Sequence, residues 1–186
     1  MDELYIKKVL NGDIDAFRYF VHQYKDKAYN LAFSVLKNEF DARDAVQEAY
    51  IIAFRKLGKF RGKSKFSTWF FRIVINEALK TINKKAGKEE YIADTRTESV
   101  DPGHVEINDT VSRDQQKYYI DLAMQNIPSK EALALTLFYI EEYSVEEIRE
   151  VTGWTESNVK VLLHRARKSM YHELNVLLST EKKTLY

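Results

Sequence analysis

The chain has 186 residues, of which 45% are hydrophobic and 13% are aromatic, so it can bury a substantial core. It contains no cysteine, which excludes a disulfide scaffold, a thiolate metal site and a cysteine nucleophile, and with no signal peptide at its start we expect a cytoplasmic protein. The net charge of +1 conceals an uneven distribution of charge along the chain. Residues 1–86 carry 17 Lys and Arg against 10 Asp and Glu, residues 87–112 carry 2 against 7, and residues 113–186 carry 10 against 11. This asymmetry points to a polyanionic partner.

The predicted elements of residues 1–86 are helices, because apolar residues recur there at steps of three and four. The first helix carries an apolar stripe over residues 17–35, and either Asp13 or Asp15 can cap its free N–H groups. The second helix runs from about residue 41 to residue 57, where Gly58 is a plausible stop.

A third helix is predicted to begin after Ser67 or Thr68 and to continue to about Asn83. No segment of the chain alternates apolar and polar residues with period two, so we expect an all-α fold without a sheet. No run of eighteen apolar residues is present, so we expect no insertion into a membrane.

Residues 87–112 interrupt the helical pattern. They hold seven acids, the turn sequence Asp101-Pro102-Gly103 and few apolar residues, which is the composition of a flexible, solvated linker. The segment is too long for an ordinary loop within one compact domain. We therefore expect two small helical domains, residues 1–86 and 113–186, joined by a flexible acidic linker.

Helices are predicted to resume at about Arg113. The first of them should end near Ile127, and Ser129 is expected to cap the next. The last helix has an apolar stripe over residues 159–177, and residues 181–186 are expected to form a frayed tail.

A helix-turn-helix unit is predicted within the second domain. Ser144 and Glu147 form a capping box, Gly153 supplies the turn, and Thr155 caps the second helix, which is basic and therefore suits the major groove of duplex DNA. The alternative to a DNA-binding helix-turn-helix is a helical hairpin that merely ends in a basic helix. Arg149 stands at the close approach of the two helices, so it must point outward or loosen the crossing. The apolar residues expected to join the two helices are Ile148, Val151, Val159 and Leu162.

Residues 49–76 combine seven bases and seven aromatic residues with no acid. Bases attract phosphates and aromatic rings stack on exposed nucleobases, so this composition favours binding to single-stranded nucleic acid. A solvated basic face beside ordinary core aromatics would have the same composition, and the sequence alone leaves both interpretations open.

Acidic residues share one face of the second predicted helix, because Asp41, Asp44 and Glu48 follow at steps of three and four. A two-metal nuclease site could begin in this way, but no histidine accompanies the acids, so a solvated or partner-binding face is favoured. The four histidines show no ligand spacing, and neither a phosphate-binding loop nor a nucleophile elbow is present. We therefore predict no metal site, no cofactor, no catalytic residue and no enzymatic activity.

Three segments together resemble the bacterial extracytoplasmic-function (ECF) sigma factors, the minimal two-domain class of the sigma-70 family. Residues 41–51 resemble the helix that docks on the clamp of RNA polymerase, and residues 60–76 resemble the segment that melts the promoter and recognises its minus-ten element. Residues 144–167 resemble the helix-turn-helix that reads the minus-thirty-five element. The likeness covers nearly the whole chain, and it makes residues 1–86 sigma region 2 and residues 113–186 sigma region 4.

The resemblance implies a role for each segment. The polymerase-binding residues would be Asp41, Asp44, Gln47 and Glu48, supported by Ile51 and Phe54. The loop that captures a flipped minus-ten base would be Arg61, Gly62, Lys63, Ser64 and Lys65, and the residues that hold the separated strand would be Phe66, Trp69, Arg72 and Asn76. The residues that face the minus-thirty-five groove would be Lys160, Val161, His164 and Arg165, with Ser157, Asn158 and Arg167 on backbone phosphates.

Two departures from the family pattern affect the second domain. Val161 and Leu162 stand where polar or basic residues are frequent, which implies fewer polar contacts to bases, and Arg149 replaces a small residue. The implied partners are core RNA polymerase, through its clamp and flap, promoter DNA in duplex and single-stranded form, and an anti-sigma factor, which is often anchored in the membrane. The implied location is the cytoplasm, at the nucleoid or held at the inner membrane by that anti-sigma factor.

The implied mechanism is promoter opening without nucleotide hydrolysis. No nucleotide-hydrolysis motif is present, so binding to separated strands must supply the few kcal/mol that each flipped base costs. A stand-alone helix-turn-helix regulator, which would bind an operator tightly without polymerase, is the alternative function.

Overall fold

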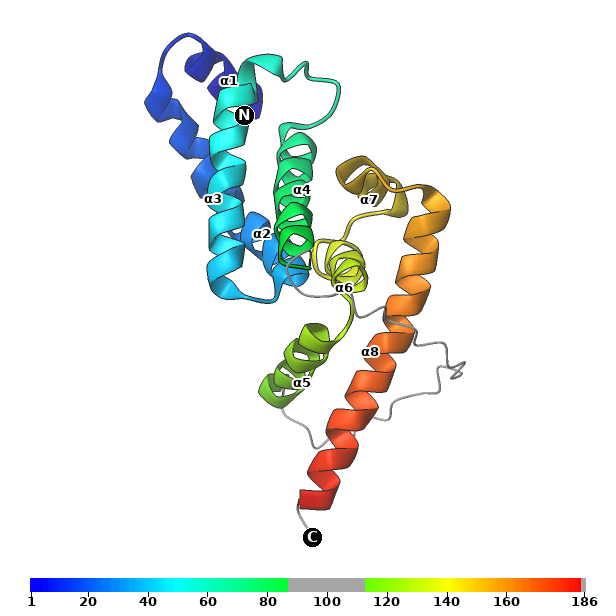
Figure 1. Ribbon diagram of the computed structural model, residues 1–186. Coiled ribbons are helices and arrows are strands. Elements are labelled where there is room, and N and C mark those ends of the chain that lie inside the picture. The colour runs from blue at the N-terminus through cyan, green and yellow to red at the C-terminus, as the bar shows by residue number, and fades with distance from the viewer. Residues whose placement is uncertain (87–112, 185–186) are drawn as a thin grey trace.

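The structure is a computed structural model that describes residues 1–86 and 113–184 (Figure 1). The predicted linker, residues 87–112, lies outside the described residues. In the first domain the elements are α1 (Asp2–Leu10), the 3₁₀ turn η1 (Ile14–Phe17), α2 (Arg18–Leu36), α3 (Glu39–Lys56), the 3₁₀ turn η2 (Leu57–Lys59) and α4 (Phe66–Ala86). In the second they are α5 (Arg113–Asn126), α6 (Ser129–Leu135), the π-helical turn η3 (Thr136–Ile140), α7 (Val145–Thr152) and α8 (Glu156–Thr184). The described residues contain helices and no strand, which confirms the all-α prediction.

The core of the first domain lies among α2, α3 and α4, which pack against one another. The buried face of α3 is built from small residues at steps of three and four, Ala42, Ala45, Ala49 and Ala53, all at most 5% exposed. Small side chains let the neighbouring backbones approach closely, and the volume is filled by large rings from the other two helices. The rings of Phe20 on α2 and Phe66 on α4 lie 4.2 Å apart, and each such buried ring contributes roughly 1.5–3 kcal/mol.

The first domain also contains a helix that sequence reasoning missed, α1. The side-chain carboxylate of Asp2, the first residue of α1, accepts hydrogen bonds from the hydroxyls of Tyr19 (3.0 Å) and Tyr24 (2.6 Å). The ring of Tyr5 stacks on that of Tyr19 with centroids 4.0 Å apart. These contacts come from α2, so α1 is fixed by tertiary packing rather than by its own short and mostly exposed sequence.

The N-terminal caps of the first domain differ in detail from the prediction. Asp13 is a cap, but it accepts from the N–H of Ala16 at the start of η1 rather than from α2. Asn38 caps α3 through the N–H of Asp41, so that helix starts at Glu39.

The second domain confirms two predicted caps and corrects one. Ser144 and Glu147 form both hydrogen bonds of the capping box, and the Thr155 hydroxyl accepts from the N–H of Asn158 at 3.2 Å. Ser129 was expected to be a cap, but Pro128 holds that position and Ser129 is the first helical residue, because proline is favoured where no N–H is needed. The predicted frayed tail is also wrong over residues 181–184, which continue α8.

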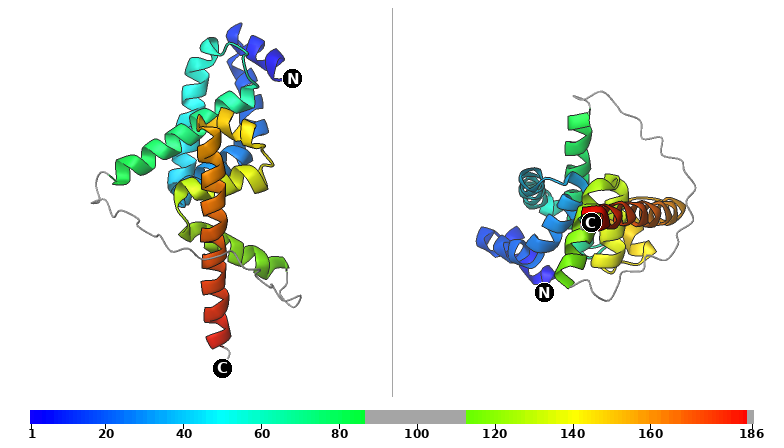
Figure 2. Two further views of the ribbon diagram at one scale, coloured as in Figure 1. Left: turned by 90° about the vertical axis from the view of Figure 1, so that its right-hand side faces the viewer. Right: turned by 90° about the horizontal axis from the view of Figure 1, so that it is seen from below.

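The two domains lie against each other in this structure. Helix α6 packs on α2 and α7 packs on α4, so one continuous core includes Phe20 and Phe70 from the first domain and Leu133 and Ile148 from the second. Helix α8 extends beyond this common core, and its C-terminal end points away from α1 (Figures 1 and 2).

Candidate nucleic-acid and partner interfaces

The acidic face of α3 is open to solvent, with one exception. Asp44, Gln47 and Glu48 are exposed, whereas Asp41 is only 23% exposed and its carboxylate accepts a hydrogen bond from the Lys85 ammonium near the end of α4. Asp41 is therefore partly committed to joining α3 to α4. No group of three acids or histidines in the described part of the chain could hold a metal ion, so the nuclease alternative lacks a site there.

Apolar side chains complete this face of α3. Ile51 is 36% exposed and Phe54 is 38% exposed, and Phe40, which sequence reasoning missed, is 77% exposed. Phe40 precedes Asp44 by one helical turn, so the same spacing rule that selected the acids could have selected it. An exposed phenylalanine beside carboxylates is suited to contact with another protein.

A shallow open depression of about 370 Å³ adjoins this face. Phe54 forms one wall, and Ile14, Phe17 and Val21 from η1 and α2 form much of the remainder. Ile14 is 66% exposed and Val21 is 37% exposed, so the apolar surface of α3 continues onto the neighbouring helices.

Every residue of the basic loop before α4, from Arg61 to Lys65, is exposed. Gly62 has a positive φ of 66°, a conformation that glycine adopts without strain, and Phe60 and Phe66 frame the loop with ring centroids 5.8 Å apart. Phe66 is only 3% exposed and packs in the aromatic core. Phe66, which was expected to contact the separated strand, lies in the core in this structure, where its ring supports the loop from inside.

The exposed side of α4 continues this basic surface. Trp69 is partly exposed and leans on Phe60 and Phe66 at 5.3 and 5.6 Å between centroids, so one side of the indole is supported by the core. Arg72 and Asn76 follow at steps of three and four and are both exposed. A supported indole beside cationic groups is an arrangement on which a nucleobase can stack.

The helix-turn-helix of the second domain forms as predicted. Ile148, Val151 and Val159 are completely buried and Leu162 is 9% exposed, so these four residues do join α7 to α8. Gly153 ends α7 with a φ of 76°, the left-handed conformation of a helix C-cap. Val161 and Leu162 were both expected to stand at positions that face DNA. Leu162 instead belongs to this core, and only Val161, which is 46% exposed, lies on the surface.

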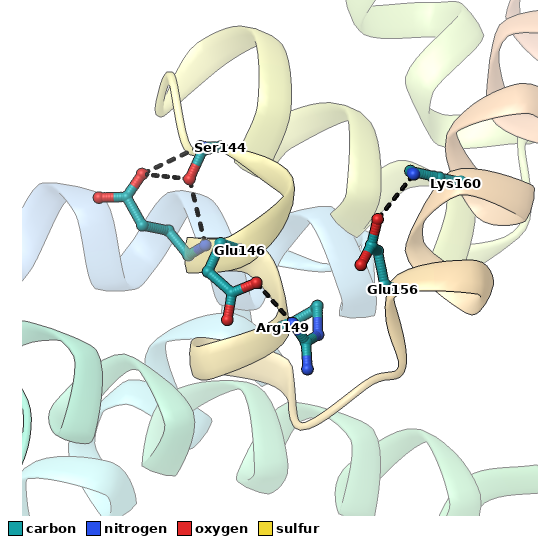
Figure 3. Close-up of polar contacts among 6 residues, drawn as sticks. Ser144, Glu146, Arg149, Glu156 and Lys160 are labelled. Atoms are coloured by element: carbon teal, nitrogen blue, oxygen red, sulfur yellow. Dashed lines mark hydrogen bonds and ion pairs between the residues drawn. The ribbon is translucent and has the colours of Figure 1, made fainter.

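Arg149 is half-buried at the end of α7, with 38% of its side chain exposed. Its guanidinium pairs with Glu146 at 2.5 Å, and its Nε is buried without a hydrogen-bond partner among the described residues (Figure 3). The backbone N–H and hydroxyl of Ser144 both donate to Glu147, and these bonds hold the pKa of that carboxyl below its ordinary value.

The solvent face of α8 gathers the polar and basic residues named from the sequence. Ser157, Asn158, His164 and Arg165 are exposed, and Lys160 is exposed while paired with Glu156 at 2.7 Å (Figure 3). A surface ion pair of this kind contributes little and exchanges readily for a phosphate contact. Arg167 is also exposed, and its Nε donates to the hydroxyl of Tyr139.

Comparison with known proteins decides the family. The sigma-70 region 2 model matches residues 20–87 and the sigma-70 region 4 model matches residues 117–170. The chain is 34% identical to the ECF RNA polymerase sigma factor SigW of Bacillus subtilis over 181 residues, which are 92% of this chain and 96% of that protein. The chain belongs to the ECF sigma factors of RNA polymerase.

Other relatives agree with this assignment. The RNA polymerase sigma-H factor of Pseudomonas aeruginosa is 31% identical over 95% of both chains. The fold of this sigma factor is similar to that of the sigma factor RpoE in its complex with the anti-sigma factor NepR from Bartonella quintana (TM-score 0.64, 22% identity, 86% of this chain and 97% of that chain). It is also similar to CnrH in complex with the cytosolic domain of CnrY (TM-score 0.61, 18% identity, 96% and 97%).

Members of this family are initiation factors for transcription rather than enzymes: regions 2 and 4 bind core polymerase and promoter DNA. None of the described helices of this sigma factor is both long enough and apolar enough to span a membrane.

The sigma factor is closed in this structure by polar contacts between its domains. Lys27 on α2 pairs with Glu141 at 2.7 Å and lies 5.1 Å from the ring centroid of Tyr143. Lys37, the left-handed C-cap of α2, donates to the carbonyl oxygens of Gln125 and Ile127 at the end of α5. Burial lowers the pKa of Lys37, so its ammonium has exchanged water for these carbonyls.

Closure brings the helix-turn-helix against the basic surface of α4. A Cβ atom added to Gly153 would lie 3.0 Å from a terminal nitrogen of Arg72. Lys65 also lies close enough to Glu147 to contribute to the lowered pKa of that carboxyl, after the larger effect of its hydrogen bonds with Ser144. Two exposed residues assigned to minus-ten DNA, Lys65 and Arg72, therefore lie beside the second domain in the closed arrangement.

Proposed function

We propose that the two domains divide the work of promoter recognition. Residues 1–86, as region 2, dock on core polymerase and bind the opened minus-ten element, and residues 113–186, as region 4, read the minus-thirty-five element. The observation that carries this division is the exposure of an acidic, apolar face and a basic, aromatic face on the first domain, together with a basic recognition helix on the second.

The polymerase contact is assigned to the exposed residues of α3. Asp44, Gln47 and Glu48 would supply polar recognition, and Ile51 and Phe54 would supply apolar area. Phe40 joins this set because it is the most exposed apolar residue of the face. Asp41 acts through its bond to Lys85, which fixes α3 against α4, more than through direct contact.

The opened strand is assigned to the loop 61–65 and the exposed residues of α4. A flipped base would enter beside Arg61, Lys63 and Lys65, and the next base would stack on Trp69. Base stacking on an aromatic side chain is worth about 1–3 kcal/mol, which is comparable to the few kcal/mol that extrusion costs. Binding to separated strands can therefore offset opening without nucleotide hydrolysis.

The duplex contact is assigned to the solvent face of α8. Lys160, Val161, His164 and Arg165 would face the major groove, because they surround the side of the helix opposite the buried Val159. Ser157, Asn158 and Arg167 flank that set and would bind phosphates. Each good bidentate contact between an arginine and a guanine contributes about 1–3 kcal/mol of discrimination.

Promoter binding requires the closed arrangement to open. The two promoter elements are named for positions about 25 base pairs apart, which is about 85 Å of B-DNA at 3.4 Å per base pair. The recognition helix begins at Glu156, three residues after the contact between Gly153 and Arg72, so the closed chain cannot place both surfaces on their elements. Residues 87–112 could span at most about 90 Å when extended, which is enough for the separation.

An anti-sigma factor is a proposed partner of the closed form. The sigma factor RpoE, which has the same fold, is in complex with the anti-sigma factor NepR in its solved structure. A ligand that binds the closed arrangement more tightly than the open one would hold this sigma factor inactive.

Transcript mapping tests the proposed function. Core polymerase is incubated with genomic DNA of the encoding organism, with and without the chain, and the 5′ ends of the RNA are sequenced. The proposal predicts new start sites that share one sequence about 10 base pairs upstream and another about 35 base pairs upstream. If the chain creates no new start sites, or if they share no upstream sequence, the proposal is wrong.

A further inference from the structure

Arg167 on α8 is held in place by two aromatic residues from a different element. Its Nε donates a hydrogen bond to the hydroxyl of Tyr139 at 2.8 Å. Its guanidinium carbon lies 5.7 Å from the ring centroid of Tyr139 and 5.8 Å from that of Phe138, within the range of cation–π attraction. An exposed arginine ordinarily samples many rotamers, so three contacts to one side chain define an orientation.

Arg167 is exposed and keeps most of its hydrogen-bonding capacity. A guanidinium carries five N–H donors, and the bond from Nε leaves the four on the two terminal nitrogens. No carboxylate of the described residues pairs with Arg167, unlike Lys160 on the same helix, which pairs with Glu156. Two parallel N–H groups on the terminal nitrogens match the geometry of a phosphate.

The turn η3 is what presents Tyr139 to Arg167. Thr136 and Leu137 at its start are buried, whereas Tyr139 near its end is 56% exposed. A π-helical turn is wider than an α-helical one, and such turns occur frequently at functional sites. Because more than half of Tyr139 is in solvent, the core does not require this ring, and its main polar contact is the bond to Arg167.

We propose that Tyr139 is a positioning residue for DNA binding, which acts by orienting the guanidinium of Arg167 toward a backbone phosphate of the duplex on α8. This inference rests on the proposed function of α8 as the duplex-binding helix. An arginine that is already ordered loses less conformational freedom when it binds, so removal of the tyrosine hydroxyl weakens DNA binding without removing a charge.

Salt-dependent binding of the full chain tests the proposal. The probe is a fluorescein-labelled 30-base-pair duplex of mixed sequence, titrated by anisotropy from 25 to 200 mM KCl, since a phosphate contact does not depend on base sequence. The variants are Tyr139→Phe, Arg167→Ala and the double variant. Tyr118→Phe removes a hydroxyl from a tyrosine that is similarly exposed (60%) but lies on α5, and it serves as the matched control. Arg165→Ala tests the recognition helix itself.

The proposal predicts a defined pattern. Loss of one phosphate contact in Arg167→Ala lowers the magnitude of the slope of log K against log salt by about 0.9. If the variant and the wild type bind equally at 1 M salt, this change makes the variant bind about eightfold more weakly than the wild type at 0.1 M salt. Tyr139→Phe loses affinity about threefold, the double variant is no weaker than Arg167→Ala, and Tyr118→Phe matches the wild type. A merely structural role for Tyr139 would lower the melting temperature and would add to the effect of Arg167→Ala.

Other results overturn one claim or the other. If Arg167→Ala weakens binding while Tyr139→Phe leaves both affinity and slope unchanged, the positioning role is wrong and the duplex assignment of α8 stands. The positioning role is also wrong if the two changes are additive. If neither Arg165→Ala nor Arg167→Ala alters binding, α8 is not the duplex-binding helix, and the proposed function of the second domain fails with the inference.

Discussion

Replacement of Lys27 by methionine should open the closed arrangement. The Lys27 ammonium lies 2.7 Å from the Glu141 carboxylate, and the two side chains are 38% and 7% exposed, respectively. In Lys27→Met the aliphatic stem remains, but a nearly buried carboxylate loses its cation in the closed form and regains water only in the open form. The substitution therefore destabilises the closed form selectively.

The magnitude follows from the partial exposure of the pair. Unit charges about 4 Å apart attract by about 4 kcal/mol at an effective dielectric constant of about 20. The closed form also removes water from both groups, and the exposed part of Lys27 is screened, so we expect a net loss of about 1–2 kcal/mol. That loss corresponds to a roughly 5- to 30-fold increase in the ratio of open to closed molecules.

Distance measurements between two spin labels can detect this shift. The chain has no cysteine, so Gln23→Cys on α2 and Asn175→Cys on α8, both at exposed positions, provide unique labelling sites. Lys27→Met should enlarge the long-distance population. The double variant Lys27→Met/Glu141→Gln should open less, because it leaves no unpaired carboxylate.

Lys80→Met is the matched control for this measurement, because Lys80 pairs with Glu77 at 3.2 Å within α4 and joins no two domains. It should leave the distance distribution of the wild type unchanged. The reasoning would be refuted if Lys27→Met and Lys80→Met gave the same distribution.

Three further predictions concern the second domain. Ser144→Ala should cost about 1 kcal/mol of unfolding free energy, measured by urea denaturation. The folded-state pKa of Glu147 lies below its ordinary value of 4.5, so the contribution of the capping box should be present above that pH and be lost as the pH falls through the lowered pKa. Ser144→Ala should weaken this dependence without abolishing it, because the backbone N–H of residue 144, the larger cause of the shift, still donates to Glu147. Gly153→Ala should cost about 1 kcal/mol through its positive φ, while the added methyl should only displace the flexible end of Arg72, so a loss well above 2 kcal/mol would contradict this account. Arg165→Ala should weaken promoter binding by the polymerase complex by about 1–3 kcal/mol and relax specificity at one position, and a uniform loss across all sequences would instead indicate a phosphate contact.

The sequence predicted most of the second domain because its signals are local. A capping box needs only Ser144 and Glu147 three residues apart, and the stop at Gly153 needs only a residue that accepts a left-handed conformation. The prediction that Ser129 caps α6 was wrong, because Pro128 occupies the cap position. A rule based on serine alone does not take the preceding proline into account.

The burial of individual aromatic residues was less predictable. Phe66 and Trp69 stand three residues apart in one basic segment, and composition treats them alike, yet Phe66 is 3% exposed and Trp69 reaches the surface. The position of Phe20 on another helix decides which ring is covered. Such contacts depend on tertiary packing. Helical periodicity predicts which face of a helix is buried, but it does not predict which neighbouring side chain covers each residue of that face.

Contacts between the domains could not be read from the sequence. Lys37 follows a predicted helix and has the composition of any surface lysine, but it meets carbonyl oxygens of Gln125 and Ile127, about 90 positions along the chain. The bond between Tyr139 and Arg167 joins residues 28 positions apart. Pairing at these separations requires the fold.

A pull-down of core RNA polymerase tests the central claim most directly. Wild type is compared with Gln47→Ala/Glu48→Ala, which alters the exposed face of α3, and with the control Glu39→Ala/Arg43→Ala, which removes an exposed ion pair on the same helix. The account predicts that wild type and the control capture the polymerase and that the first variant does not. If none of the three captures the polymerase while the chain alone binds a specific duplex, the chain acts as a stand-alone regulator and the assignment of α3 is wrong.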